Sequence, residues 1–285
     1  MVEPSGTGAL GILAGGGALP LIIAREAMAA GCSVHMLAIE GSFGDLSRSP
    51  CPATAVGMGQ VGGILDALKR NGCTDLVIAG TVERPELRQL KLDLRALTIL
   101  PMVAGMMLGG DNHLLTTVVR FFEGKGLRVL GADDIAPSLL AGVGPLGNLR
   151  PTAEGAADVA RAFEIVKALG ALDVGQAAVV SKGYTLAVEA AEGTDSMLER
   201  VAELRRKRGR LDGRRKGVLV KRAKPGQDRR VDLPGIGPRT VELAAAANLA
   251  GIGIQSRGVL VIEREQIIAG ADRLGLFVTG VADAD

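Results

Sequence analysis

Short apolar runs alternate with amphipathic segments through the first half of the chain. Four runs have the length and aliphatic composition of buried strands: 10–14, 33–39, 75–79 and 127–130. Three segments between or after them have the apolar spacing of helices: 19–30, 60–70 and 114–123. Because strands that alternate with helices usually form a parallel sheet covered on both faces, the pattern predicts an α/β domain over residues 1–135.

The pattern changes between residues 136 and 151, where proline and glycine recur and charge is scarce. We expect a linker here. Thr152 is a suitable N-cap for a helix that follows the linker and runs to about Leu169.

The second half, residues 152–285, mixes strands and helices less regularly. Expected strands are 177–181, 184–189, 217–221, 259–262 and 276–279. Expected helices start near 195, where Ser196 and Glu199 fit a capping box, and run over 238–249 and 265–274. Because Lys182-Gly183 is typical of a hairpin turn, we predict a mixed α/β domain with some antiparallel pairing.

Composition narrows the chemistry that this fold can carry. The 285 residues suffice for two domains, and 47% hydrophobic with 22% charged residues excludes a disordered chain or a disulfide scaffold. Only His35 and His113 are histidines, which argues against zinc sites and imidazole-rich binuclear phosphatase sites. One Tyr, five Phe and no Trp imply an aliphatic core and little stacking on a nucleobase.

Cysteines and apolar segments indicate the compartment. The three cysteines are odd in number and form no CxxC pair, which fits a reduced cytosol. No basic segment precedes an apolar run at the N-terminus, and no apolar run reaches 18 residues. We therefore expect a cytoplasmic protein without a signal peptide or transmembrane helix, and peripheral contact with a membrane stays open.

Positive charge is concentrated in one segment, although the net charge is only +2. Residues 200–230 hold 14 basic and three acidic residues, a net charge of +11, and the rest of the chain carries −9. This asymmetry suggests an anionic partner: a phosphorylated small molecule, an anionic membrane surface or a nucleic acid. For the run Arg205-Arg206-Lys207-Arg208 alone, the alternative is a solvated helix face.

Two glycine-containing segments are candidate ligand loops in the first half. Gly15-Gly16-Gly17 lies between an expected strand and helix, where backbone amides can face a phosphate. The alternative is a tight turn that needs glycine for its backbone, and the spacing is not that of a dinucleotide-binding loop. Asp111 and Asn112 follow two further glycines and would either line a cleft or cap the next helix.

Two further motifs in the second half carry acids and bases together. Glu192-Gly193-Thr194-Asp195 connects an expected strand to a helix, which places two carboxylates around a Gly-Thr pair. The segment 221–240 holds three Pro-Gly or Gly-Pro pairs, six basic residues and two acids. Cleavage of a pyrophosphate needs this mixture, because cations neutralise the phosphoryl oxygens and carboxylates hold a hard divalent cation. A salt-bridged surface loop is the alternative.

These motifs together resemble the LpxI-type UDP-2,3-diacylglucosamine pyrophosphatases. The matching segments are Ala14-Gly-Gly-Gly-x-Leu19-Pro20, Glu192-Gly-Thr-Asp195, Lys224-Pro-x-Gln-Asp-x-Arg-x-Asp-Leu-Pro234 and Ala271-Asp-x-x-Gly275. The resemblance spans about residues 9–280, and the Lys-Pro-x-Gln-Asp segment is its most specific part. It implies a Rossmann-like N-terminal domain, a distinct mixed α/β catalytic domain over 152–285 and a homodimer.

The resemblance also implies a reaction. The family hydrolyses UDP-2,3-diacylglucosamine to UMP and 2,3-diacylglucosamine 1-phosphate (lipid X) in lipid A biosynthesis of Gram-negative bacteria. Water attacks the β-phosphorus, and Mg²⁺ or another divalent cation is required. Contact with the inner membrane would follow from a lipid substrate, whose acyl chains need an aliphatic groove.

Site roles follow from the same resemblance. It implies Asp228 as the essential acid, which binds Mg²⁺ or orients water. The expected further metal-shell carboxylates are Glu192, Asp195 and Asp232. The expected substrate-binding residues are Gly16, Gly17, Asp111, Asn112, Gly193, Thr194, Lys221, Lys224, Gln227, Arg229, Arg230 and Gly237.

Three alternative functions fit parts of the same sequence. One is a pyrophosphatase for another nucleotide-sugar or nucleotide-lipid. Another is a nucleic-acid-binding protein that uses residues 200–230, which lack interleaved aromatics and base-reading motifs; we expect no nucleic-acid partner. The last is a nicotinamide-dependent oxidoreductase that uses the Gly15–Gly17 loop.

Overall fold

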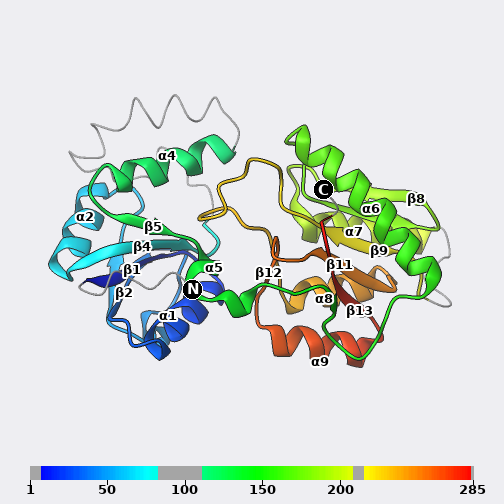
Figure 1. Ribbon diagram of the computed structural model, residues 1–285, viewed down its shortest axis with the longest axis horizontal. Helices are drawn as coiled ribbons and strands as arrows, with labels where there is room; N and C mark the ends of the chain where they lie inside the picture. Colours follow the sequence, from blue (N-terminus) through cyan, green and yellow to red (C-terminus); the bar gives the residue numbers. More distant parts are fainter. Residues whose placement is uncertain (1–7, 83–110, 208–214, 284–285) are drawn as a thin grey trace. The chain divides into compact units, whose positions relative to one another are not determined.

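A computed structural model describes residues 8–82, 111–207 and 215–283 of the chain (Figure 1). Contacts divide it into two units. The N-terminal unit runs to Pro137 and also includes Asp228–Asp232, whereas the C-terminal unit comprises Ser138–Gln227 and the residues from Leu233 onward. Among the described residues, no helix is both long and apolar enough to cross a membrane.

The N-terminal unit is built on a five-stranded parallel sheet. Its strands are β1 (Ala9–Ala14), β2 (Val34–Ile39), β3 (Ala53–Val56), β4 (Cys73–Ala79) and β5 (Arg128–Leu130). They lie in the order β3-β2-β1-β4-β5, and every pair is parallel. This is the strand order of the Rossmann fold, which confirms the predicted class of this domain.

Helices cover both faces of this sheet. They are α1 (Leu19–Ala29), α2 (Val61–Arg70), α4 (Asp111–Glu123) and α5 (Ala132–Ile135), with a short 3₁₀ helix η1 (Leu46–Arg48). Figure 1 shows α1 on one side of the strands and α2 and α4 on the other. Because both faces are covered, all six residues of β2 are buried, which explains the unbroken apolar run in the sequence.

The C-terminal unit contains a mixed six-stranded sheet. Its strands are β6 (Gly144–Pro145), β7 (Ala177–Ser181), β8 (Tyr184–Val188), β9 (Val218–Lys221), β11 (Gly251–Gln255) and β13 (Phe277–Val281). Their order is β6-β13-β11-β9-β7-β8. The three central strands are parallel, and β6, β7 and β8 pair antiparallel to their neighbours. A separate parallel pair joins β10 (Gly235–Ile236) to β12 (Leu260–Val261). The mixed domain is therefore confirmed.

The two faces of this sheet carry different helices. The helices are α6 (Ala153–Ala171), α7 (Gly193–Lys207), α8 (Pro238–Ala246) and α9 (Arg264–Leu274), with a 3₁₀ helix η3 (Pro137–Leu139) before them. Ala178 and Val180 of β7 pack with α6 on one face. Ala177 and Val179 pack with α7, α8 and α9 on the other. Side chains alternate between faces along a strand, so each strand supplies both cores.

The structure agrees with some of the local predictions from the sequence and contradicts others. The Thr152 hydroxyl accepts the Gly155 amide at 3.1 Å, which confirms it as an N-cap. The capping box at Ser196 and Glu199 is wrong, because α7 already begins at Gly193. The expected strand 259–262 is reduced to the two residues of β12. Within the stretch expected to be a linker, Gly144–Pro145 forms β6 and pairs with β13.

Candidate active site

The carboxylate of Asp228 sits in a tight turn formed by residues 228–232, here called the Asp228 turn. The Asp228 carbonyl accepts the amides of Val231 at 3.1 Å and Asp232 at 3.0 Å, which closes the turn. Arg230 donates from Nε to Oδ1 at 2.9 Å and from Nη2 to Oδ2 at 2.7 Å. This fork holds the Asp228 carboxylate, which is only 14% exposed, and lowers the pKa of Asp228.

Contacts group the Asp228 turn with the N-terminal unit. Arg230 donates its remaining Nη1 to Glu123 Oε1 at 2.6 Å, at the end of α4. Arg229 donates to Asp133 of α5 at 3.1 Å, and Val231 packs against the apolar core of that unit. The acid predicted to be essential is therefore held by residues of the Rossmann-like unit, about a hundred positions away in sequence.

Lys224 and Gln227 form the turn that precedes Asp228. The Gln227 amide donates to the Lys224 carbonyl at 3.4 Å, and Gly226 between them has φ of 75°. Proline followed by a glycine of positive φ is the requirement of a type II turn, which explains the Pro225-Gly226 pair. The Gln227 side chain accepts the Lys224 amide at 3.0 Å, and Lys224 Nζ donates to Asp173 at 2.8 Å.

The motif 192–195 forms the start of α7 in the C-terminal unit. Gly193 has φ of 79°, a conformation that favours glycine. Glu192 is ion-paired with Arg200, and its pKa is lowered by its own backbone amide and by Arg200. Asp195 accepts Arg239 Nε of α8 at 2.7 Å. Both carboxylates thus have cationic partners within their own unit.

Lys221 has an environment unlike that of the other predicted cations. It ends β9, is 8% exposed, and donates from Nζ to Thr194 Oγ1 at 2.9 Å and to the Gly235 carbonyl at 3.0 Å. The Thr194 hydroxyl donates to Glu189 Oε1 at 2.6 Å. Burial lowers the pKa of Lys221, and the charges of Glu189 and Asp195 oppose that shift.

The glycines at the end of β1 satisfy local backbone geometry. The Gly15 and Gly16 amides donate to the carbonyls of Ala79 at 2.8 Å and Thr81 at 2.7 Å. A Cβ on Gly15 would approach Thr81 O to 2.6 Å. Gly17 has φ of 89° and open space around a Cβ. The Gly16 amide is therefore occupied, so the predicted phosphate contact would have to come from Gly17 onward.

The remaining predicted residues lie at helix starts. Gly237 is the N-cap of α8, with Pro238 in the first turn as expected, and its amide donates to Thr240 Oγ1 at 3.3 Å. Asp111 and Asn112 begin α4, but their side chains lie outside the described residues, as do Gly109 and Gly110. The structure therefore does not test the predicted substrate contacts of Asp111 and Asn112.

Among the described residues of the basic segment 200–230, most basic side chains have a carboxylate or a backbone carbonyl as partner. The buried Arg205 donates to the carbonyls of Ala247, Asn248 and Lys216 at 2.6–2.8 Å. Further partnered residues of this segment are Arg200 with Glu192, Lys207 with Glu203, Arg222 with Asp283, Lys224 with Asp173, Arg229 with Asp133 and Arg230 with Asp228 and Glu123. Within the described residues, the local excess of +11 therefore does not form a continuous unpaired basic surface.

The donor set predicted for a metal consists of carboxylates only. Oxygen donors of this kind are what Mg²⁺ prefers, so the residue types fit the ion. Asp228 and Asp232 belong to one unit, and Glu192 and Asp195 to the other. Within the residues that the structure describes, no three His, Cys, Asp or Glu side chains form a group suited to a metal.

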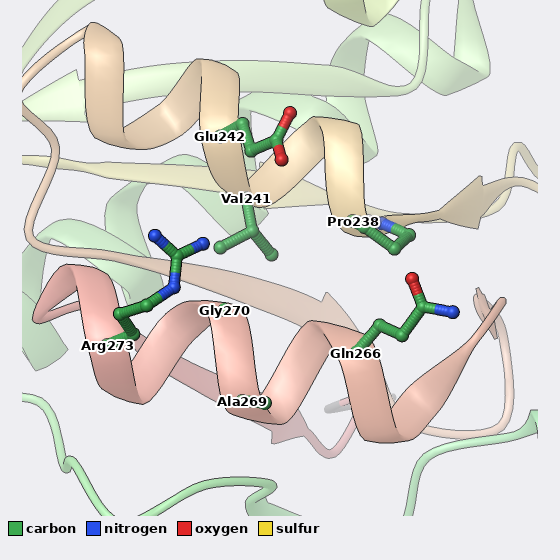
Figure 2. A pocket seen from close by; sticks show the side chains of 7 residues that line it. All are labelled: Pro238, Val241, Glu242, Gln266, Ala269, Gly270 and Arg273. Carbon is green, nitrogen blue, oxygen red and sulfur yellow. The ribbon is translucent and has the colours of Figure 1, made fainter.

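A groove of about 330 Å³ lies between α8 and α9 of the C-terminal unit. Figure 2 shows Glu242 of α8 and Arg273 and Gln266 of α9 around it, with Val241 between the helices. Pro238 forms one end, next to Gly237. A lining with this many charged and amide groups does not match an acyl chain, since these groups would be desolvated.

Comparison with known proteins places the chain in a family. The family described as LpxI N-terminal domain matches residues 9–139, and the one described as LpxI C-terminal domain matches residues 142–279. The chain belongs to the LpxI family. It is 45% identical over 273 residues to a Caulobacter vibrioides protein named UDP-2,3-diacylglucosamine pyrophosphatase LpxI, covering 95% of this chain and 97% of that protein.

Asp228 falls within the LpxI C-terminal domain match, yet its contacts group it with the N-terminal unit. Sequence reasoning missed Glu123, Asp133 and Asp173, the partners of Arg230, Arg229 and Lys224, because nothing in an isolated surface carboxylate identifies its partner. Glu189 could be identified from the sequence, because it is an acidic residue directly after an apolar strand.

Proposed function

We propose that this chain hydrolyses UDP-2,3-diacylglucosamine to UMP and 2,3-diacylglucosamine 1-phosphate, as a step in lipid A biosynthesis. The observation that carries the proposal is the 45% identity over nearly the full length of a relative named for this pyrophosphatase activity. The site residues support it, because Asp228 stands among cations that match a pyrophosphate in charge.

Asp228 is the acid at the centre of the proposed reaction. An aspartate carboxyl is already ionised at neutral pH, and Arg230 lowers the pKa of Asp228 further, so its oxygens accept hydrogen bonds. In this state it orients the attacking water, or accepts a proton from it, as water attacks the β-phosphorus. The P–O bond to the UMP leaving group then breaks, and the oxygen of water ends on the lipid phosphate.

Lys224, Arg229 and Arg230 are the proposed phosphate-binding cations. Each holds a carboxylate in the structure, and the side chains of Arg229 and Arg230 are 49% and 36% exposed. Surface ion pairs are worth about 0–1 kcal/mol, so a phosphate of higher charge can replace the carboxylate at little cost. The first amides of α7, at Gly193 and Thr194, add donors at a helix N-terminus.

Mg²⁺ is the proposed cofactor. Asp228 would hold it, with Glu192, Asp195 and Asp232 as further oxygen donors, directly or through water. When bound, the ion would neutralise charge that develops on the phosphoryl oxygens.

We further propose a cytoplasmic homodimer that makes peripheral contact with the inner membrane. The support is chemical: a diacylated substrate partitions into a lipid surface, so the enzyme must approach that surface to bind it. Light scattering at several protein concentrations tests the dimer. Cosedimentation with anionic vesicles tests the membrane contact.

The activity is tested by incubating the purified chain with UDP-2,3-diacylglucosamine and Mg²⁺ and measuring the nucleoside monophosphate that is released, which is UMP for this substrate. Parallel reactions use a UDP-sugar without acyl chains, which would release UMP, and a CDP-linked lipid, which would release CMP. UMP release from the first substrate alone supports the proposal, and a chelator should abolish it until Mg²⁺ is restored. Preference for either other substrate would assign the site to a different nucleotide-sugar or nucleotide-lipid, and no turnover at all would refute the activity.

A further inference from the structure

Glu189, Thr194, Lys221 and Gly235 form a network in the interior of the C-terminal unit, here called the Lys221 network. Its position follows from the sheet register. Lys221 of β9 is the partner of Ala177 of β7, and the Ala177 carbonyl accepts the Glu189 amide at 2.9 Å. Glu189, which directly follows β8, thus lies in one row with Ala177 and Lys221.

Burial makes this row unusual. Glu189 is 5% exposed, Thr194 8% and Lys221 8%. Charged side chains are rarely buried unless they are paired, and here the pairing passes through the hydroxyl of Thr194. Thr194 accepts from Lys221 and donates to Glu189, so both hydrogen-bonding roles of the hydroxyl are filled. The second oxygen of Glu189 accepts the Gln176 amide at 3.2 Å.

The network joins two segments that the sequence identified as ligand loops. Thr194 lies at the start of α7, directly after Gly193 and before Asp195. The Gly235 carbonyl, which accepts the second bond from Lys221, begins the Gly235–Pro238 segment that leads into α8. An ammonium group between them fixes the position of the α7 start relative to the segment before α8.

We propose that Lys221 is a positioning residue, which acts through Thr194 and Gly235 and does not bind the substrate phosphates itself. This differs from its expected role as a phosphate-binding cation. The inference rests on the proposed pyrophosphatase activity and concerns how its substrate-binding segments are held. Two of the three Nζ donors bond to Thr194 and Gly235, and Lys221 as a whole residue is 8% exposed.

A double-mutant cycle with Thr194→Val and Lys221→Met tests the proposal. Thr194→Val keeps the shape of the side chain and removes the hydroxyl, while leaving the lysine in place. If the two residues act as one unit, each single variant lowers kcat by about ten- to a hundredfold, since small misplacements have effects of this size. The double variant should then lie within about threefold of the slower single variant, because the effects of coupled residues do not multiply.

Thr194→Ser is the second arm of the experiment, because it restores the hydroxyl. It should recover most of the turnover lost in Thr194→Val, and this comparison stands even if Lys221→Met fails to fold. Thr185→Val on β8 and Lys207→Met on α7 are matched controls at exposed positions and should leave turnover unchanged.

Two results would overturn the proposal. In the first, Thr194→Val keeps nearly full activity while Lys221→Met loses it, or the effects of the two substitutions multiply in the double variant. Either outcome would mean that Lys221 binds the substrate directly. In the second, Thr194→Ser and Thr194→Val are equally impaired. Failure of the proposed function is a separate outcome, since the unmodified protein would then release no UMP in the same assay.

Discussion

The Asp228 turn and the Lys221 network use the same kinds of side chain in different environments. The side chains of Arg229, Arg230 and Glu123 are 36–49% exposed, and those of Asp228 and Asp133 are 14% and 16% exposed. Glu189 and Lys221 of the network are 8% exposed or less. Exposed pairs exchange partners at little cost, whereas breaking a buried pair leaves an uncompensated charge. The turn can therefore release its cations to a ligand, and the network can only hold its segments in place.

The largest expected effect is on catalysis, at Asp228. Asp228→Ala should lower turnover by about 10³-fold, the range for loss of a group that transfers or orients a proton. The fold should persist, because the turn is also held by Val231 and Arg229. Steady-state UMP release measures the loss of turnover, and circular dichroism measures whether the fold persists. Asp228→Asn is the size-matched companion, and either variant keeping most of its activity would remove Asp228 from the centre of the mechanism.

The next largest effect is on stability, at Glu189. Glu189→Gln leaves the buried Lys221 ammonium without the carboxylate to which Thr194 links it, and should lower the free energy of unfolding by about 2–4 kcal/mol. The matched variant Glu192→Gln removes an exposed partner of Arg200 and should lower the free energy of unfolding much less, because solvent screens an exposed ion pair. Urea unfolding measures the free energy of unfolding of both variants. Equal losses would mean that the two environments do not differ as described.

A smaller effect on rate is expected at Glu123. Glu123→Gln weakens the outer contact of Arg230, so the fork on Asp228 is less well held, and kcat/KM should fall by about three- to tenfold. Unfolding free energy should change little at this exposed position. Glu164→Gln on α6, which removes an exposed partner of Arg161, is the control. Unchanged kinetics in Glu123→Gln would show that the N-terminal unit does not position Asp228.

The smallest effect is a shift along the pH axis. Arg230 lowers the pKa of Asp228, so the carboxylate form persists to lower pH than usual, and the stabilisation from the pair is lost only as pH falls through that lowered value. Arg230→Met should return the pKa toward its ordinary value and move the acidic limb of the kcat/KM profile to higher pH. Arg161→Met is the control for this limb. An unmoved limb in Arg230→Met would show that another group sets it.

The fold was largely predictable because its apolar runs are long and separated by clear turns. The strand over Gly251–Gln255 was not predicted, although it lies in the middle of the C-terminal sheet. Its sequence, Gly-Ile-Gly-Ile-Gln, follows a helix closely and has glycine at alternate positions. The structure supplies the reason: a Cβ on Gly251 would lie 2.4 Å from the Phe277 ring. Tertiary packing, which no local pattern records, made glycine necessary there.

The site was predictable as a set of residues and less so as a set of contacts. The segments around Asp228 and Thr194 stand out because acids, bases and turn residues are dense in them. Their partners come from distant positions: Glu123 is 107 residues from Arg230, and Lys221 is 27 residues from Thr194. The burial of Lys221 depends on the register of β9 with β7, and spacing along the chain does not specify that register.

The position of water attack tests the proposed mechanism most directly. UDP-2,3-diacylglucosamine is hydrolysed by the protein in ¹⁸O-labelled water with Mg²⁺, and both phosphate products are examined by mass spectrometry. Attack at the β-phosphorus predicts label in 2,3-diacylglucosamine 1-phosphate and unlabelled UMP. Label in UMP would place the attack on the α-phosphorus, and the absence of UMP would contradict the proposed reaction altogether.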